Sequence, residues 1–304
     1  MKLLNCVKLK IFTIEQFSCY LCVPMAMKTR LVALFACFFL GIVAPSQAQF
    51  ATNASRSELG FMVGGTYYIG DINRFMPYRN THLAGGLMYR FNLHPRAALR
   101  ANFIYGGLSG EDSDSNLEQQ IQRNLSFKTD IWELAGGIEF NYFPFQIGND
   151  RYKGTAYLVA QIGVFRMNPK AIGENGNEVE LQPLGTEGQG TSLSDRNPYS
   201  LTQLVIPLGV GAKLSLGDKA SLNFEIGLRK TFTDYIDDIG SDSYVDPDVL
   251  AAENGPLAAT MSNRSLNNER FGRRGDASTN DWYIFTGAML TFRLGQPSKC
   301  FHHL

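Results

Sequence analysis

Charged side chains recur at alternate positions within apolar segments of this sequence. Glu133 and Glu139 interrupt one such segment, and Glu225 and Arg229 interrupt another. At a spacing of two residues they share one face of a β-strand, opposite the large apolar side chains. Charges enclosed away from water are costly unless they pair. We therefore predict structural ion pairs among these four residues, with a path for transported ions as the alternative.

The four histidines offer little for catalysis, because a serine or aspartate nucleophile needs an adjacent base. His82 and His94 fall at opposite ends of one predicted strand, and His302 and His303 lie near the C-terminus. Of these, His82 alone is placed near a loop rim, where a membrane-embedded hydrolase would need it. Gly106–Gly110 has the composition of a nucleophile elbow without its spacing. No enzymatic activity, catalytic residue or cofactor is predicted, and a hydrolase using His82 is the alternative.

A segment before the last predicted strand is rich in aspartate: Asp234, Asp237, Asp238, Asp242, Asp246 and Asp248. Carboxylate oxygens at this density could bind Ca²⁺, but their spacing lacks the regular ligand pattern of an EF-hand. We expect a solvated acidic loop and predict no metal site. Whether residues 233–280 form a plug, a lid or a disordered loop is left open.

Eight segments with alternating apolar and polar residues must position these side chains: 58–70, 83–91, 97–108, 130–143, 155–166, 201–216, 221–232 and 281–294. The last of them has the length of a tilted bilayer strand, about 9 to 11 residues, with aromatic residues near both ends. The larger apolar side chains oppose the charged ones, as expected where the outside is lipid and the lumen is polar. Trp132, Phe140, Leu208 and Phe224 should therefore point outward. The facing of 155–166 is ambiguous, and Pro207 predicts a bulge or weak pairing.

The fold predicted is all-β: an eight-stranded antiparallel transmembrane up-and-down β-barrel in the cell outer membrane. Because an open edge is costly in lipid, the last strand must pair with the first. Connections 71–81, 109–129, 168–199 and 233–280 are long, whereas 92–96, 144–154 and 217–220 are shorter. This asymmetry predicts long extracellular loops and short periplasmic turns. Eight strands leave an interior that side chains fill, so open conduction is not expected.

The N-terminal region has the parts of a signal peptide: a basic start at Met27, an apolar run to Ala44 and small residues ending at Ala48. We predict a leader and signal peptide over 1–48, cleaved after Ala48, with translation starting at Met25 or Met27, and a barrel domain over 49–304. Acylation of Cys37 as a lipoprotein is the alternative.

Cleavage after Ala48 would leave 23 basic and 27 acidic residues, a net charge of about −4. That charge gives no reason to expect a nucleic-acid partner. Cys300 would be the single remaining cysteine, which excludes a disulfide framework and a thiolate metal site.

Five segments carry a resemblance: RSELGFMVGGTYYIGDIN (56–73), RNLSFKTDIWELAGGIEFNYFP (123–144), ELQPLGTEGQG (180–190), RKTFTDYIDD (229–238) and DWYIFTG (281–287). They resemble the outer-membrane barrel family of Bacteroidetes that includes the PorG component of the type IX secretion system. The resemblance implies a non-enzymatic barrel that anchors the periplasmic ring of the secretion apparatus to the outer membrane. Its partners would be outer-membrane lipid and the ring proteins, with no small-molecule substrate. A small porin-like or ligand-binding barrel is the alternative. The tail 295–304 departs from the family pattern, in which the chain ends near the aromatic residue of the last strand.

Overall fold

The computed structural model describes residues 56–74, 76–149, 151–267 and 270–295 of the chain. The predicted leader and signal peptide (1–48), the cleavage site after Ala48, and the residues Cys37, Cys300, His302 and His303 lie outside the described residues.

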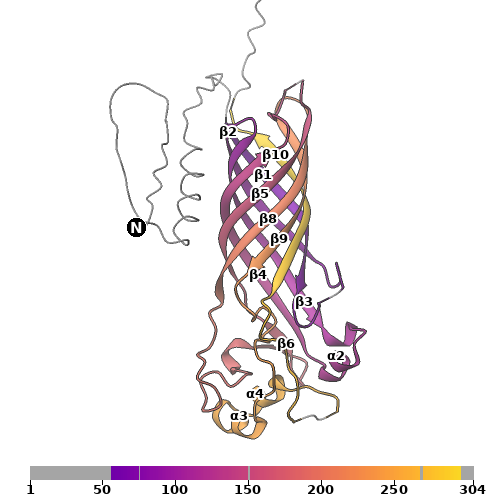
Figure 1. Ribbon diagram of the computed structural model, residues 1–304, viewed down its shortest axis with the longest axis vertical. Coiled ribbons are helices and arrows are strands. Elements are labelled where there is room, and N and C mark those ends of the chain that lie inside the picture. Colours follow the sequence, from indigo (N-terminus) through magenta and orange to yellow (C-terminus); the bar gives the residue numbers. More distant parts are fainter. Residues whose placement is uncertain (1–55, 75, 150, 268–269, 296–304) are drawn as a thin grey trace, which may run out of the picture. The chain divides into compact units, whose positions relative to one another are not determined.

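Eight strands form the barrel wall: β1 (Ser57–Ile69), β2 (His82–His94), β3 (Ala97–Glu111), β4 (Ser126–Asn141), β5 (Gly154–Arg166), β8 (Thr202–Ser215), β9 (Ala220–Thr231) and β10 (Trp282–Arg293). They pair in the order β3-β2-β1-β10-β9-β8-β5-β4, and β3 pairs with β4 to close the ring (Figure 1). Every wall strand thus has two antiparallel partners, so the barrel has no open edge in the bilayer. The predicted fold is confirmed, with each strand end within four residues of its predicted position.

Alternate residues of each strand point outward. Trp132, Phe140, Leu208 and Phe224 are 50, 50, 48 and 52% exposed, as predicted. In β5, Leu158, Ile162 and Val164 are exposed whereas Tyr157, Val159 and Phe165 are buried, which resolves the ambiguous facing of that strand. A belt of exposed apolar side chains around every strand is far larger than the patches that soluble monomers expose. It is the surface that hydrocarbon covers in a membrane barrel.

Pro207 interrupts the ladder between β5 and β8 without shifting its register. Ala160 lies opposite Leu208 and Gly163 opposite Val205, but the two intervening positions do not pair with β5. On its other side Pro207 keeps its place opposite Arg229 of β9. The structure therefore has weak pairing at Pro207 and no bulge, because proline removes one N–H donor.

The connections are long at one end of the barrel and short at the other. Three long ones contain small elements: η2 (Asp112–Asp114) and α2 (Glu118–Arg123) after β3; β6 (Lys170–Ile172), β7 (Glu178–Glu180) and η3 (Gln182–Leu184) after β5; and α3 (Pro247–Asn254) and α4 (Pro256–Ser262) after β9. All of them lie beyond the same end of the strands (Figure 1). The loop asymmetry is confirmed, whereas none of these short elements was predicted. No helix among the described residues has the length and apolarity to cross a membrane.

The outward face gives a direct prediction. Leu208 lies near the middle of β8 and is 48% exposed, while Leu266, in the last long loop, is 61% exposed. Leu208→Lys should lower the free energy of unfolding from lipid vesicles by about 2–4 kcal/mol, because a lysine there faces hydrocarbon. Leu266→Lys, its control, should change that free energy by less than about 0.5 kcal/mol. Equal effects in denaturant titrations would contradict a lipid-facing β8.

Candidate functional site

The bore contains a charge network centred on Glu139 of β4. Arg90 Nη2 lies 2.9 Å and Arg100 Nη1 3.3 Å from Glu139 Oε2, and Lys213 Nζ bonds Oε1. Arg90 also pairs with Glu58 at 2.6 Å, and Arg100 pairs with Glu225 at 2.5 Å. Three carboxylates thus balance three cations, and all six side chains are at most 3% exposed.

A second ion pair lies nearer the long loops. Arg229 Nε is 3.3 Å from Glu133 Oε2, and the Tyr283 hydroxyl donates to the same oxygen at 2.7 Å. All four predicted residues are in ion pairs, but Glu133 and Arg229 alone pair with each other, and Glu139 and Glu225 pair with Arg90, Arg100 and Lys213. The other members of the network, Glu58, Arg90, Arg100 and Lys213, were not predicted as ion-pair partners, although each alternates with outward-facing residues of its strand. Aromatic side chains fill the space around the charges, among them Tyr157 and Phe285.

The extracellular mouth is covered by two segments that we call the cap: residues 180–190 and the described part of residues 232–281, which leaves out 268 and 269. Glu187 joins them, because its Oε1 accepts from the backbone N–H groups of Gly240 at 2.9 Å and Ser241 at 3.0 Å, and from Arg274 Nη1 at 2.5 Å. Glu187 and Arg274 are 4% and 2% exposed. The segment ELQPLGTEGQG therefore contacts the last long loop around a buried charge.

Asp238 is the second anchor of the cap. Its carboxylate accepts hydrogen bonds from the hydroxyls of Thr186 and, at 2.7 Å, Tyr199, and Arg274 Nη2 lies 3.7 Å away. Asp238 has φ of 66°, in the left-handed region that few non-glycine residues adopt. These contacts hold the backbone in that conformation.

The cap is packed into the mouth of the barrel. Ile236 and Ile239 are buried in one apolar cluster with Tyr68, Ile131, Phe165 and Tyr283 of the barrel wall. The described part of 233–280 is thus a folded plug. The prediction of a solvated acidic loop was wrong for Asp237 and Asp238, which are 2% and 1% exposed, because hydroxyl, N–H and guanidinium donors satisfy them. Asp242 and Asp248 are exposed, as predicted.

The periplasmic mouth is closed by the connection between β4 and β5. Phe145 and Ile147 of this connection are buried at 3% and 1% exposure. The Phe145 N–H donates to Pro95 O at 2.9 Å, and Lys213 Nζ lies 5.0 Å from the centroid of the Phe145 ring. Both ends of the bore are therefore covered by side chains.

Residues 33–186, about half of the chain, match the family described as "Domain of unknown function (DUF6089)". The chain belongs to the DUF6089 family. The matched part includes β1 to β5 and the first part of the cap, up to Thr186. No curated protein matches the sequence.

Solved structures similar to this DUF6089 barrel include Neisserial surface protein A, with 9% identity and a TM-score of 0.40, covering 80% of this chain and 99% of that one. Ail of Yersinia pestis, in complex with a heparin analogue, has 8% identity and a TM-score of 0.37, covering 79% and 99%. OprG of Pseudomonas aeruginosa has 10% identity and a TM-score of 0.36, covering 80% and 99%.

The closed antiparallel ring, the apolar belt and the loop asymmetry are the properties of outer-membrane barrels. This DUF6089 member is an outer-membrane β-barrel protein, with its long loops extracellular and its short turns periplasmic.

His82 does have a serine partner. Its Nε2 lies 2.7 Å from Ser109 Oγ, on the rim between β2 and β3. The hydrogen bonds described for this imidazole include no carboxylate, which a triad would use to orient it. Gly106–Gly110 lies inside β3, with no turn that would expose a nucleophile.

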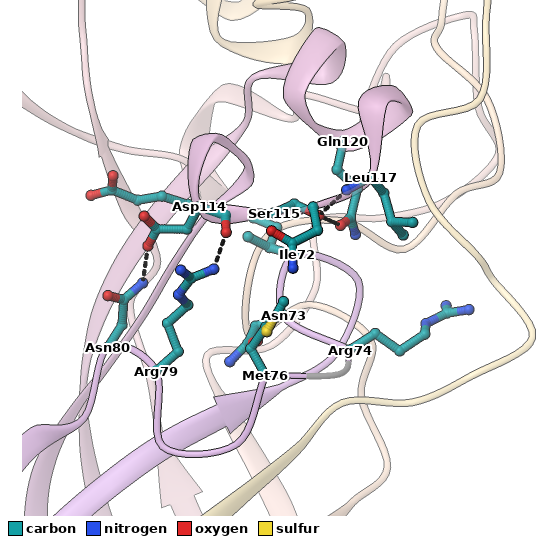
Figure 2. Close-up of a pocket in the computed structure, with 12 residues that line it drawn as sticks. Ile72, Asn73, Arg74, Met76, Arg79, Asn80, Asp114, Ser115, Leu117 and Gln120 are labelled. Atoms are coloured by element: carbon teal, nitrogen blue, oxygen red, sulfur yellow. Dashed lines mark hydrogen bonds between the residues drawn. The ribbon is translucent and has the colours of Figure 1, made fainter.

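A cavity of about 210 Å³ lies between the first and second extracellular loops of the DUF6089 barrel. Figure 2 shows Arg79 and Asn80 pointing toward Asp114, to which both are hydrogen-bonded, with Met76 between Arg79 and Arg74. A second cavity of about 370 Å³ lies beside it, between α2 and the last loop. Small-molecule pockets are commonly about 300–1,000 Å³. Among the described residues, no group of three or more His, Cys, Asp or Glu side chains could hold a metal ion.

Three carboxyls lie where the cap of the DUF6089 barrel meets β1 and β10. The Tyr68 hydroxyl is 2.6 Å from Asp237 Oδ2 and 2.8 Å from Asp281 Oδ1. A hydroxyl carries one proton, so one of these carboxyls must hold another if both contacts are hydrogen bonds. Burial, with the neighbouring charge of Asp71, raises the pKa of Asp237. Burial and the charge of Asp237 raise the pKa of Asp234 to about 9.

These raised pKa values predict that the cap weakens as the pH rises. The folded cap retains protons that the unfolded chain has released, so its stability is fullest below about pH 4 and declines towards about pH 9. The rate of hydrogen exchange at the backbone amides of residues 232–241 should therefore rise as the pH is raised through this range. Asp237→Asn should flatten the dependence, because its amide can donate to Tyr68 without titrating. Exchange that slows with rising pH, after correction for its intrinsic rate, would contradict the assignment.

Proposed function

We propose that this DUF6089 barrel is a non-enzymatic structural component of type IX protein secretion, which anchors the periplasmic ring of the apparatus to the outer membrane. The observation that carries the anchoring role is the filled bore: a neutral network of buried ion pairs lies between two covered mouths. A barrel built in this way supplies a stable membrane attachment and no solute path. The secretion role is supported by the resemblance of the five sequence segments.

The buried ion pairs of the bore can also stiffen the barrel, as a membrane anchor requires. Pairs such as Arg100 and Glu225 join strands on opposite sides of the ring, across 125 residues of sequence. Breaking one partner of such a pair typically costs about 3–5 kcal/mol. The network therefore resists deformation of the barrel when a partner pulls on its periplasmic end.

Co-purification tests this proposal. The tagged barrel, extracted in mild detergent from its own cells, should retain the periplasmic ring proteins of the type IX apparatus, whereas an unrelated eight-stranded barrel with the same tag should not. If the ring proteins do not co-purify, even after chemical cross-linking in intact cells, the secretion role is refuted.

A small porin-like or ligand-binding barrel is the second candidate, because the extracellular loops enclose the cavities of about 210 and 370 Å³. The two candidates differ in what deletion of the protein would change. Loss of an anchor should stop secretion of type IX cargo, while loss of a solute barrel should leave secretion intact.

A further inference from the structure

Each of the three periplasmic connections presents an exposed cation. Arg96 lies between β2 and β3, Lys153 lies between β4 and β5, and Lys219 lies between β8 and β9. We call these residues the turn cations. Among the described residues of these connections, Asp218 is the one exposed carboxylate. The described part of the periplasmic end is therefore basic.

The backbone fixes the positions of the turn cations. The backbone carbonyl of each one accepts a hydrogen bond from the N–H of a residue on a neighbouring strand. Asn141 donates to Arg96 at 2.8 Å, Ser215 to Lys153 at 2.7 Å and Arg293 to Lys219 at 2.9 Å. The salt bridges among the described residues include none from Arg96, Lys153 or Lys219, so these side chains are not held in ion pairs with the barrel. The backbone of each turn is thus held in place, and its exposed charge is available to a partner.

The β4–β5 connection joins the turns into one face. Its Phe145 N–H donates to Pro95 O at 2.9 Å, and its Gly148 N–H donates to Ser215 Oγ at 3.0 Å. It therefore contacts the β2–β3 connection on one side and the end of β8 on the other. Because this face lies across the mouth of the barrel, it is exposed to the periplasm. Lipid headgroups, in contrast, surround the barrel laterally.

Arg151 shows how a cation at the same end is placed for lipid. Its guanidinium carbon lies 5.5 Å from the centroid of the Tyr152 ring, which stacks on Phe143 at 6.0 Å. Phe143 is 45% exposed and packs in turn against Tyr142. Exposed aromatic clusters of this kind form the interfacial girdle of membrane barrels. Lys153 follows Tyr152 in the chain, but the cation–π contact with that cluster among the described residues is made by Arg151 and by none of the turn cations.

We propose that the turn cations dock an acidic protein surface of the periplasmic ring, an inference that rests on the proposed function. Complementary charge orients the encounter and raises the association rate. The attraction must also be screened by salt, because the Debye length falls from about 10 Å at 0.1 M to about 3 Å at 1 M.

The test is capture of purified ring complex by the tagged barrel in nanodiscs of zwitterionic lipid. The triple variant Arg96→Glu, Lys153→Glu, Lys219→Glu should reduce capture at about 0.1 M salt by about tenfold or more, and wild-type capture should fall on raising salt to about 1 M. Two matched controls, Arg151→Glu at the same end and Lys128→Glu on the extracellular side, should capture as wild type does. Heat-modifiable migration on gels verifies that each barrel is folded, and the triple glutamine variant should be intermediate.

The outcomes separate this inference from the proposed function. If wild type and the triple glutamate variant capture the ring equally, the docking surface is refuted while the anchoring role stands. If wild type captures nothing, both are refuted. If ring capture is unchanged but the triple variant no longer binds vesicles containing phosphatidylglycerol, the turn cations serve lipid headgroups and the protein-docking inference is overturned.

Discussion

Glu139→Ala is expected to lower the free energy of unfolding of the barrel by about 3–5 kcal/mol, or to prevent its folding at physiological temperature. Glu139 is 1% exposed, and its two oxygens contact Arg90, Arg100 and Lys213. Removing the carboxylate leaves three buried cations with two remaining carboxylates, Glu58 and Glu225. Water cannot compensate, because Phe145 and the cap cover the ends of the bore.

Denaturant titration in lipid vesicles or detergent measures this loss. Glu178→Ala is the matched control, since its carboxylate is 50% exposed and lies 3.8 and 4.0 Å from two exposed lysines. Such a surface pair contributes at most about 1 kcal/mol. Adding Lys213→Met to Glu139→Gln should recover part of the stability, because the charges again balance. A Glu139→Ala barrel within about 1 kcal/mol of wild type would contradict the network.

Arg274→Leu is expected to open the cap while leaving the barrel strands folded. Its guanidinium lies 2.5 Å from Glu187 and 3.7 Å from Asp238, and it donates to Asp238 O at 2.8 Å. Without it the buried carboxylate of Asp238 loses its cation, and Glu187 keeps the more distant Arg196, at 3.8 Å on the surface. This loss should cost the cap about 3–5 kcal/mol. The left-handed backbone at Asp238 adds to the tendency to unfold locally.

Limited proteolysis of the intact, reconstituted protein measures this opening of the cap. The rate of cleavage within 232–281 should rise at least about a hundredfold, because each loss of about 1.4 kcal/mol in stability raises the population of the open cap tenfold. The barrel itself should remain folded and heat-modifiable on gels. Arg270→Leu provides the control, because Arg270 is 46% exposed and pairs with Asp246 and Asp248 on the surface. If both variants are cleaved at the wild-type rate, the buried Arg274 does not hold the cap.

The barrel could be predicted from the sequence because every wall strand has the same pattern, in which lipid-facing apolar residues alternate with residues that face the bore. In β4 the outward residues Trp132 and Phe140 alternate with Glu133 and Glu139, and one strand fixes the facing of its neighbours. The pattern was weakest in β5, where both faces are apolar because Tyr157 and Phe165 fill the bore.

The cap could not be predicted, because its order comes from contacts between distant segments. Glu187 meets Arg274 across 87 residues, and Tyr68 meets Asp281 across 213. An aspartate-rich segment without apolar periodicity gives no sign that partners elsewhere will bury Asp237 and Asp238. The motifs ELQPLGTEGQG and RKTFTDYIDD were recognised through resemblance, but nothing in the sequence indicated the hydrogen bond between Thr186 and Asp238 that joins them.

Conductance of the purified wild-type protein in planar lipid bilayers tests most directly whether the barrel is a sealed membrane anchor. With the bore filled by the Glu139 network and both mouths covered, we expect no stepwise current after insertion is verified by protease protection. A steady, ohmic conductance in every inserted barrel would show an open path and contradict the account.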